Sequence, residues 1–164
     1  MSRAMTIVTT ALGAVLAAAV VVVGGLGGAT YWQHVRLAGE QQSAADLPAL
    51  AKDAIPKILG FDYQTVERSR VDAYTLMTPS FRKQYEDQTG SKIIPEARQR
   101  QVVSQVTVVG AGVESAQRDS GSVLVFVNRV ITDKSKQPAY DGSRLRVDYQ
   151  KIDGKWLINS ISPV

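Results

Sequence analysis

The feature that most constrains this chain is a long run near its N-terminus, from Ala4 to Val35, in which His34 is the only residue able to carry a charge. The apolar part of this run, about residues 5–31, would span roughly 40 Å as an α-helix, enough to cross a hydrocarbon core of about 30 Å. Backbone N–H and C=O groups cannot be left unpaired in lipid, so such a segment must be helical. The sequence therefore predicts that residues 1–36 form an N-terminal tail and a single transmembrane helix.

A cleaved signal peptide is the alternative interpretation of this run, with Arg3 before it and the small residues 17–19 at a cleavage site. Signal peptides normally contain about 7–15 apolar residues, and this run is nearly twice as long, which favours a retained anchor. The positive charges of Arg3 and Arg36 nearly balance across the helix, so they do not decide its orientation. We expect the N-terminus in the cytoplasm because a long polar region, which can be translocated, follows the helix. The predicted location is the inner membrane, with the C-terminal domain outside the cytoplasm.

The composition of the chain narrows the functions open to it. Arg3 and Arg36 account for two of its 19 Lys and Arg residues, against 15 Asp and Glu residues, so the remainder is close to neutral and lacks the basic patch typical of nucleic-acid binding. The absence of cysteine excludes disulfides, thiol catalysis and cysteine-bound metals, and the single histidine excludes metal sites built from several histidines. We therefore expect no nucleic-acid partner, no metal and no cofactor, and the composition argues against most hydrolytic enzymes.

Residues 37–164 are long enough for one domain, with helices expected at about 40–101 and strands at about 103–162. Apolar residues at spacings of three and four predict the first of these helices, which ends at Gly60. Because Pro48 and Pro56 interrupt it, we expect that helix to be broken or kinked.

Short motifs place the remaining helix boundaries. Asp62 is expected to cap a second helix, and Thr78 followed by Pro79 is typical of the start of a third. Gly90 fits the end of the third helix, and a last short helix is expected from Pro95.

The apolar periodicity then changes to two, which indicates strands. Four segments have this pattern: residues 105–113, 123–131, 145–152 and 155–161. Two dipeptides predict tight turns between strands, Ser120-Gly121 and Asp153-Gly154. The segment Val123–Val127 is apolar at every position, as expected of a strand covered on both faces. The predicted class is α+β: N-terminal helices packed on a curved antiparallel sheet of about four strands, which closes into a cone.

This order of elements resembles that of the Mce-associated membrane proteins, small single-pass proteins encoded with Mce lipid-import transporters. The resemblance is carried by the anchor and by four later stretches: Leu59–Val66, Leu76–Phe81 with Tyr85, Arg144–Ile158 and Ile161–Val164. It implies an NTF2-like cone and an accessory role beside an Mce transporter, whose Mce proteins and permease would be the partners. The same plan of anchor plus cone is similar to the VirB8 components of type IV secretion systems.

Some proteins with this cone are enzymes, which would need a carboxylate or imidazole in an apolar pocket beside an oxyanion donor. Asp72 with Tyr74 and Asp148 with Tyr149 are the nearest pairs in the sequence. Neighbours on a strand point to opposite faces, and Asp72 lies among charged residues typical of a solvated helix face. His34 fits an anchor at the membrane interface, so no Ser-His-Asp triad can form in the outer domain. We predict no catalytic residues and no enzyme activity.

Two binding surfaces are open alternatives. Six aromatic residues are candidates to line the cone, as plain core or around an apolar ligand: Tyr63, Tyr74, Phe81, Tyr85, Phe126 and Trp156. Arg144 and Arg146 share a solvated strand face, where an acidic partner or anionic lipid headgroups would meet them. The leading prediction is a non-enzymatic, membrane-anchored subunit of an Mce-type lipid-import system. The alternatives are a VirB8-like subunit of a secretion or conjugation apparatus and a lipid carrier that uses the cone.

Overall fold

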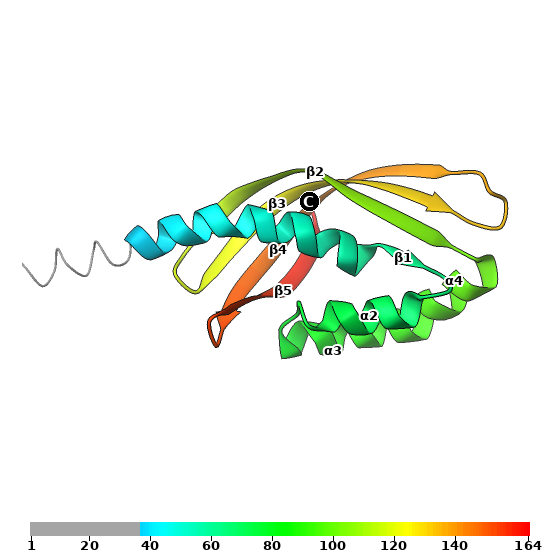
Figure 1. Cartoon of the computed structure of the whole chain (residues 1–164), viewed down its shortest axis with the longest axis horizontal. Helices are drawn as coiled ribbons and strands as arrows, with labels where there is room; N and C mark the ends of the chain where they lie inside the picture. Colours follow the sequence, from blue (N-terminus) through cyan, green and yellow to red (C-terminus); the bar gives the residue numbers. More distant parts are fainter. Residues whose placement is uncertain (1–36) are drawn as a thin grey trace, which may run out of the picture. The chain divides into compact units, whose positions relative to one another are not determined.

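The computed structural model describes residues 37–164, apart from the side chains of residues 91 and 92. A helix over residues 37–59, called the long helix below, is followed by the remaining helices and then by the large strands (Figure 1). These elements are β1 (Phe61–Asp62), α2 (Val66–Tyr74), α3 (Pro79–Gln88), the π-helical η1 (Thr89–Ile93), α4 (Ile94–Arg100), β2 (Val103–Ala116), β3 (Ser120–Thr132), β4 (Ala139–Ile152) and β5 (Lys155–Pro163). This order confirms the predicted α+β class.

The predicted transmembrane helix at about 5–31 lies outside the described residues. Within residues 37–164, no helix combines the length and the apolar character needed to cross a membrane.

The long helix is continuous from residue 37 to residue 59, so neither of its two prolines breaks it. Each proline removes one backbone donor, but tertiary packing compensates because Leu47, Ala51 and Ile55 are fully buried along one face. Gly60 ends the helix as predicted, since a Cβ at this position would lie 2.5 Å from the carbonyl oxygen of Pro56.

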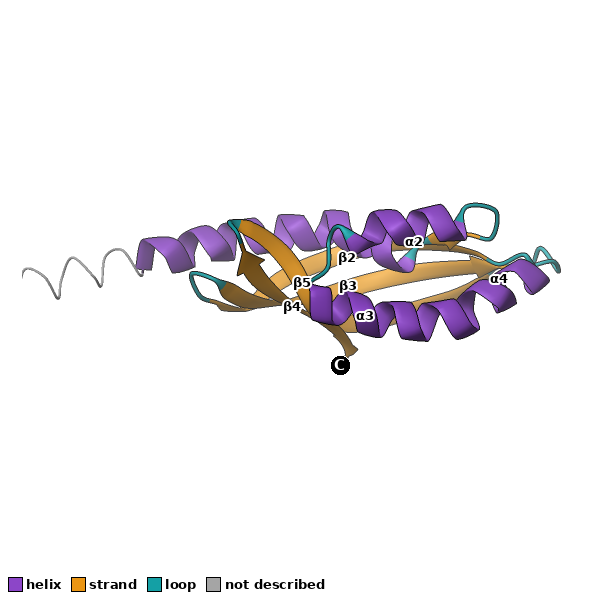
Figure 2. Ribbon diagram, turned by 90° about the horizontal axis from the view of Figure 1, so that it is seen from below, coloured by secondary structure: helices purple, strands orange, loops and turns teal. Residues whose placement is uncertain are grey.

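Of the predictions at the other helix boundaries, the structure confirms the one at Thr78 and corrects those at Asp62 and Gly90. Thr78 caps α3 as expected, with its Oγ1 accepting a hydrogen bond from the backbone N–H of Phe81 at 3.3 Å. Asp62 is not a cap: it lies in β1, its Oδ1 accepts from the N–H of Gln64 at 2.8 Å, and α2 begins only at Val66. Gly90 does not end α3, because η1 carries the chain directly into α4 as one nearly continuous stretch (Figure 2).

The sheet is an antiparallel meander in the order β1-β2-β3-β4-β5. It has five strands rather than about four, because the two-residue β1 pairs with the start of β2. The turn at Asp153-Gly154 is confirmed, with φ of 50° and 78°. The turn predicted at Ser120-Gly121 is wrong, since both residues belong to β3. Gly121 is needed there for space, because a Cβ would lie 2.5 Å from Cδ1 of Leu47.

The core lies between one face of the sheet, called the core face, and the helices. Val123, Val125 and Val127 of β3 belong to one buried cluster that also contains side chains of the long helix and α2. Partly buried side chains of α3 pack against that cluster. The alternation predicted for β4 is confirmed, with Leu145, Val147 and Tyr149 buried on the same face.

The opposite face of the sheet, called the outer face, overturns one prediction. The apolar residues of β3 were expected to be covered on both sides, but Phe126 is 41% exposed. The long helix, α2 and α3 all contribute to packing on the core face, so the outer side chains of β3 stay open.

Candidate functional site: the outer face of the sheet

Apolar side chains gather on the outer face around Phe126. The strand register places Phe126 beside Gly110 of β2 and Arg144 of β4, and Leu124 beside Gly112 and Arg146. A β-bulge between Val108 and Gly110 leaves Val109 60% exposed next to them, and the C-terminal Val164 is 68% exposed. We call Val109, Leu124, Phe126 and Val164 the outer patch.

Two open hollows meet at the ring of Phe126. The ring lines one hollow together with Val109 and Arg144, and a second together with Leu124 and Val164. The glycines of β2 keep the neighbouring strand free of side chains, so the ring stands between two concave surfaces. Single exposed apolar residues are ordinary on protein surfaces, whereas grouped ones are typical of interaction sites, which makes the outer patch the candidate site.

The two arginines that flank the outer patch differ in their pairing. Nε of Arg146 lies 3.3 Å from a carboxylate oxygen of Glu114 and 3.2 Å from one of Asp148. Arg144 is exposed, and its side chain forms no ion pair within residues 37–164. The prediction that both arginines share a solvated strand face is confirmed. Arg144 therefore presents unused guanidinium donors beside the ring of Phe126.

Asp148 anchors the polar end of the outer face. Its carboxylate accepts hydrogen bonds of 2.6 Å from both Ser122 and Ser160, in addition to the contact with Arg146. Partial burial acts to raise the pKa of this carboxyl, but these hydrogen bonds outweigh burial and hold the pKa below its ordinary value. A general base near neutral pH needs the opposite shift, so Asp148 acts here as a structural carboxylate.

The structure separates both acid–tyrosine pairs that the sequence singled out. Asp148 is on the outer face, whereas Tyr149 is buried on the core face, where burial raises the pKa of its phenol. Asp72 is exposed on α2, whereas Tyr74 is buried. His34 lies outside the described residues. Within residues 37–164, no three His, Cys, Asp or Glu side chains lie close enough to hold a metal ion.

The structure places the aromatic residues proposed to line the cone in different environments. Tyr74 and Tyr85 pack edge to face with ring centroids 6.3 Å apart, and the Tyr85 hydroxyl donates a 2.9 Å hydrogen bond to the carbonyl of Ile58. Phe81 and Trp156 also pack against the core, and Tyr63 is half-buried. Phe126 lies on the outer face, so its predicted place in the cone is wrong. Successive side chains on a strand point to opposite faces, and the neighbours of Phe126, Val125 and Val127, occupy the core face.

A small cavity of about 120 Å³ lies on the core side, between the end of the long helix, α2, η1 and β3. Tyr85 belongs to its walls, but so do two residues that the sequence analysis did not select, Arg70 and Arg129. A signal for them was present. Arg129 continues the odd-numbered, core-facing series of β3, and Arg70 lies four residues after the buried Val66 and three before the buried Ala73.

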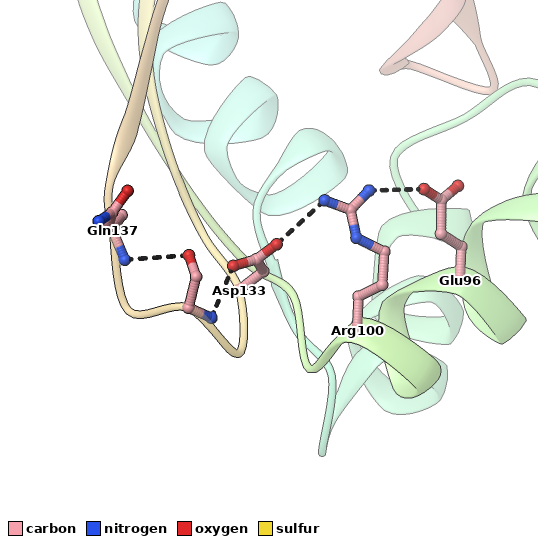
Figure 3. A network of polar contacts seen from close by, with 5 residues as sticks. Glu96, Arg100, Asp133 and Gln137 are labelled. Atoms are coloured by element: carbon pink, nitrogen blue, oxygen red, sulfur yellow. Dashed lines mark hydrogen bonds and ion pairs between the residues drawn. The ribbon is translucent and has the colours of Figure 1, made fainter.

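A polar network links the loop after β3 to α4 (Figure 3). Arg100 of α4 donates to Asp133 at 3.0 Å and to Glu96 at 3.1 Å. Hydrogen bonds from the side chain and backbone of Ser135, and then from Arg100, lower the pKa of Asp133 to about 2.

Comparison with known proteins adds a family to this geometry. A family model described as uncharacterized protein Rv1363c/MT1408-like matches residues 6–162. The outer membrane protein Rv1973 of Mycobacterium tuberculosis is 30% identical over 133 residues, which cover 81% of this chain and 83% of that protein. The uncharacterized protein Rv1362c of the same organism is 31% identical over 144 residues, covering 84% of this chain and 66% of that protein.

Several solved structures that resemble this domain are titled as secretion-system proteins. An IcmL-like type IV secretion system protein from Legionella pneumophila superposes with a TM-score of 0.64 at 12% identity, covering 73% of this chain and 92% of that one. The VirB8 protein of Agrobacterium tumefaciens gives a TM-score of 0.59 at 14% identity, covering 75% and 92%. At such low identity the likeness establishes the VirB8-like, NTF2-like fold of the domain and nothing finer.

Proposed function

Because the chain belongs to the Rv1363c/MT1408-like family and is 30% identical to a protein named for the outer membrane, we propose that it is a non-enzymatic subunit of a membrane-associated protein assembly. The observation that carries this proposal is the outer patch: exposed apolar side chains grouped around Phe126 on a sheet face that the long helix, α2 and α3 leave open. Aromatic side chains beside an arginine are enriched where protein partners bind most tightly.

The finer proposal is that the partner is a subunit of an Mce-type lipid-import transporter, which the domain stabilises or connects. It is supported by the resemblance of the N-terminal run and the later stretches to Mce-associated proteins. In this arrangement the predicted helix at about 5–31 holds the chain in the inner membrane, and the domain of residues 37–164 meets its partner outside the cytoplasm. Arg144 would pair with an acidic side chain at the edge of the contact.

The competing function is that of a VirB8-like subunit in a secretion or conjugation apparatus. The fold favours it, because the domain superposes on several proteins titled as secretion components. Both functions use the same architecture and differ in the identity of the partner. A catalytic role has less support, since the acid–tyrosine pairs are separated and the pKa of Asp148 is lowered.

Purification of the complex from native membranes in mild detergent tests the proposal. We expect the wild-type chain to bring down Mce proteins or the permease, whereas Phe126→Ser should recover at least about tenfold less, as for truncation of a buried interface anchor. Gln105→Ser, at an exposed position of the same sheet, is the matched control. Secretion components in place of Mce subunits would select the competing function, and equal recovery by the Phe126→Ser variant would reject the outer patch.

A further inference from the structure

The cavity on the core side carries more positive charge than its surroundings balance. Its walls include three cationic side chains, Lys57, Arg70 and Arg129, and no Asp or Glu occurs among the described residues that line it. Lys57 already pairs with Asp53 at 2.6 Å on the exposed side of the long helix. The two arginines are thus left as the cations that face the cavity without a counter-ion.

The guanidinium groups of these arginines are also short of hydrogen bonds. Nε and Nη1 of Arg70 and Nε of Arg129 are buried, and none of them has a partner within the described part of the chain. Burying such a donor without an acceptor is unfavourable, so buried polar atoms in proteins are nearly always paired with protein, water or a ligand. Arg70 gains a contact with the ring of Tyr74, 5.7 Å away, but that contact leaves the N–H donors unused.

Most of the rest of the cavity wall is apolar, and its uncharged polar residues are Ser69, Thr89 and Tyr85. The side chains around the arginines are mostly hydrophobic: Ile58, Leu59, Phe61, Val66, Tyr85 and Ile93. Tyr85 has no donor left for a ligand, because its hydroxyl already donates to the carbonyl of Ile58. A ligand that satisfies both parts of the wall must combine an anionic group with a small apolar body.

We propose that this cavity binds a small organic carboxylate. Its two oxygens accept hydrogen bonds from Arg70 and Arg129, since a guanidinium presents parallel donors that match a carboxylate. The volume limits the part of the ligand that is enclosed: a protein cavity of about 150 Å³ holds one benzene molecule, so about 120 Å³ holds roughly five carbon-sized atoms, the carboxylate included. The ligand is either a free small acid or the end of a fatty acid whose chain leaves the cavity. This inference goes beyond the proposed function and does not depend on the outer patch.

Ligand-observed fluorine NMR with the full-length chain in detergent tests this directly. The probes are trifluoroacetate, which is smaller than benzene, and its neutral analogue 2,2,2-trifluoroethanol, each corrected for detergent alone. The carboxylate should bind at least about tenfold more tightly than the alcohol, as expected for a charge-assisted pair. Equal binding of the two probes, or no binding of the carboxylate, would overturn the proposal without any variant being needed.

Variants locate the site. Arg70→Gln and Arg129→Gln should each weaken trifluoroacetate binding by about tenfold or more. Arg70→Lys should weaken it less, because it keeps the charge but loses the fork of donors. Arg68→Gln, on the exposed side of the same helix, is the control and should bind like the wild type. Undiminished binding by both glutamine variants contradicts the assignment.

Competition identifies the source of the carboxylate. Displacement of trifluoroacetate by propionate but not by dodecanoate indicates a free small acid, whereas displacement by dodecanoate indicates a fatty acid. Displacement by neither would count against the proposal, because both carry the group that the arginines are proposed to hold.

Discussion

On β3, Val123, Val125 and Val127 point to the core and are at most 2% exposed, whereas Phe126 points the other way and is 41% exposed. The same strand is thus apolar on both faces, but the described helices pack on only one of them. Burial within the domain explains the valines. It does not explain Phe126, since a polar residue there would serve a solvated face equally well. The comparison indicates that the core face stabilises the fold and the outer face serves a partner.

The largest difference between the two faces is expected for truncation of a packed side chain. Leu47→Ala should lower the free energy of unfolding by about 3 kcal/mol, because Leu47 is fully buried against the sheet. Phe126→Ala removes more atoms but should cost about 1 kcal/mol or less. Chemical denaturation of the full-length chain measures both, and similar losses would contradict the distinction between the faces.

Glycines on the two faces give a second, smaller contrast. Gly121→Ala places a Cβ 2.5 Å from Cδ1 of Leu47 and 2.9 Å from the carbonyl oxygen of Ser115, and should destabilise the fold by about 1–3 kcal/mol. Gly112→Ala meets no atom within 4 Å on the outer face, and its effect should stay within about 0.5 kcal/mol. Thermal unfolding of the pair provides the readout, and a Gly112 variant as unstable as the Gly121 variant would show that the outer face is covered.

Exposed polar contacts should have the smallest effect, visible in the pH dependence of stability. Asp133 has a pKa of about 2 in the folded domain, below its ordinary value of 3.8, so its contribution is present above pH 3.8 and is lost as the pH falls towards 2. Asp133→Asn should therefore be slightly less stable than the wild type at pH 6 and nearly equal to it near pH 2. Unfolding curves at both pH values test this prediction. A difference in stability between variant and wild type that is the same at both pH values would show that the charge of Asp133 does not cause it.

Local chemistry made part of the fold predictable. Thr78 before Pro79 marks a helix start through a single hydrogen bond, and the alternation in β4 follows from the two-residue period of a strand. The errors arose where distant residues decide the outcome. Packing of Leu47 keeps the long helix continuous through its prolines, and the same side chain forces glycine at position 121, which makes Gly121 look like a turn residue.

Some residues of the candidate functional surfaces could likewise be placed from the sequence, and others could not. Strand parity would have placed Arg129 on the core face, since it is in phase with Val125 and Val127, and helix periodicity would have done so for Arg70. The exposure of Phe126 has no such signal, because an apolar strand looks the same whether its second face is covered by its own chain or left for a partner. The register that brings Arg144 beside Phe126 also follows from the paired strands and not from either segment alone.

Site-specific photo-crosslinking in intact cells is the most direct test of the proposal that the outer patch binds a protein of a membrane assembly. A photoreactive amino acid would replace Phe126 in the full-length chain, with the same substitution at Arg118, an exposed residue between β2 and β3, as the control. We predict a specific crosslink from position 126, identified by mass spectrometry as a subunit of the transporter or secretion assembly, and none from position 118. The absence of any crosslink at position 126, with the protein present at wild-type levels, would contradict the account.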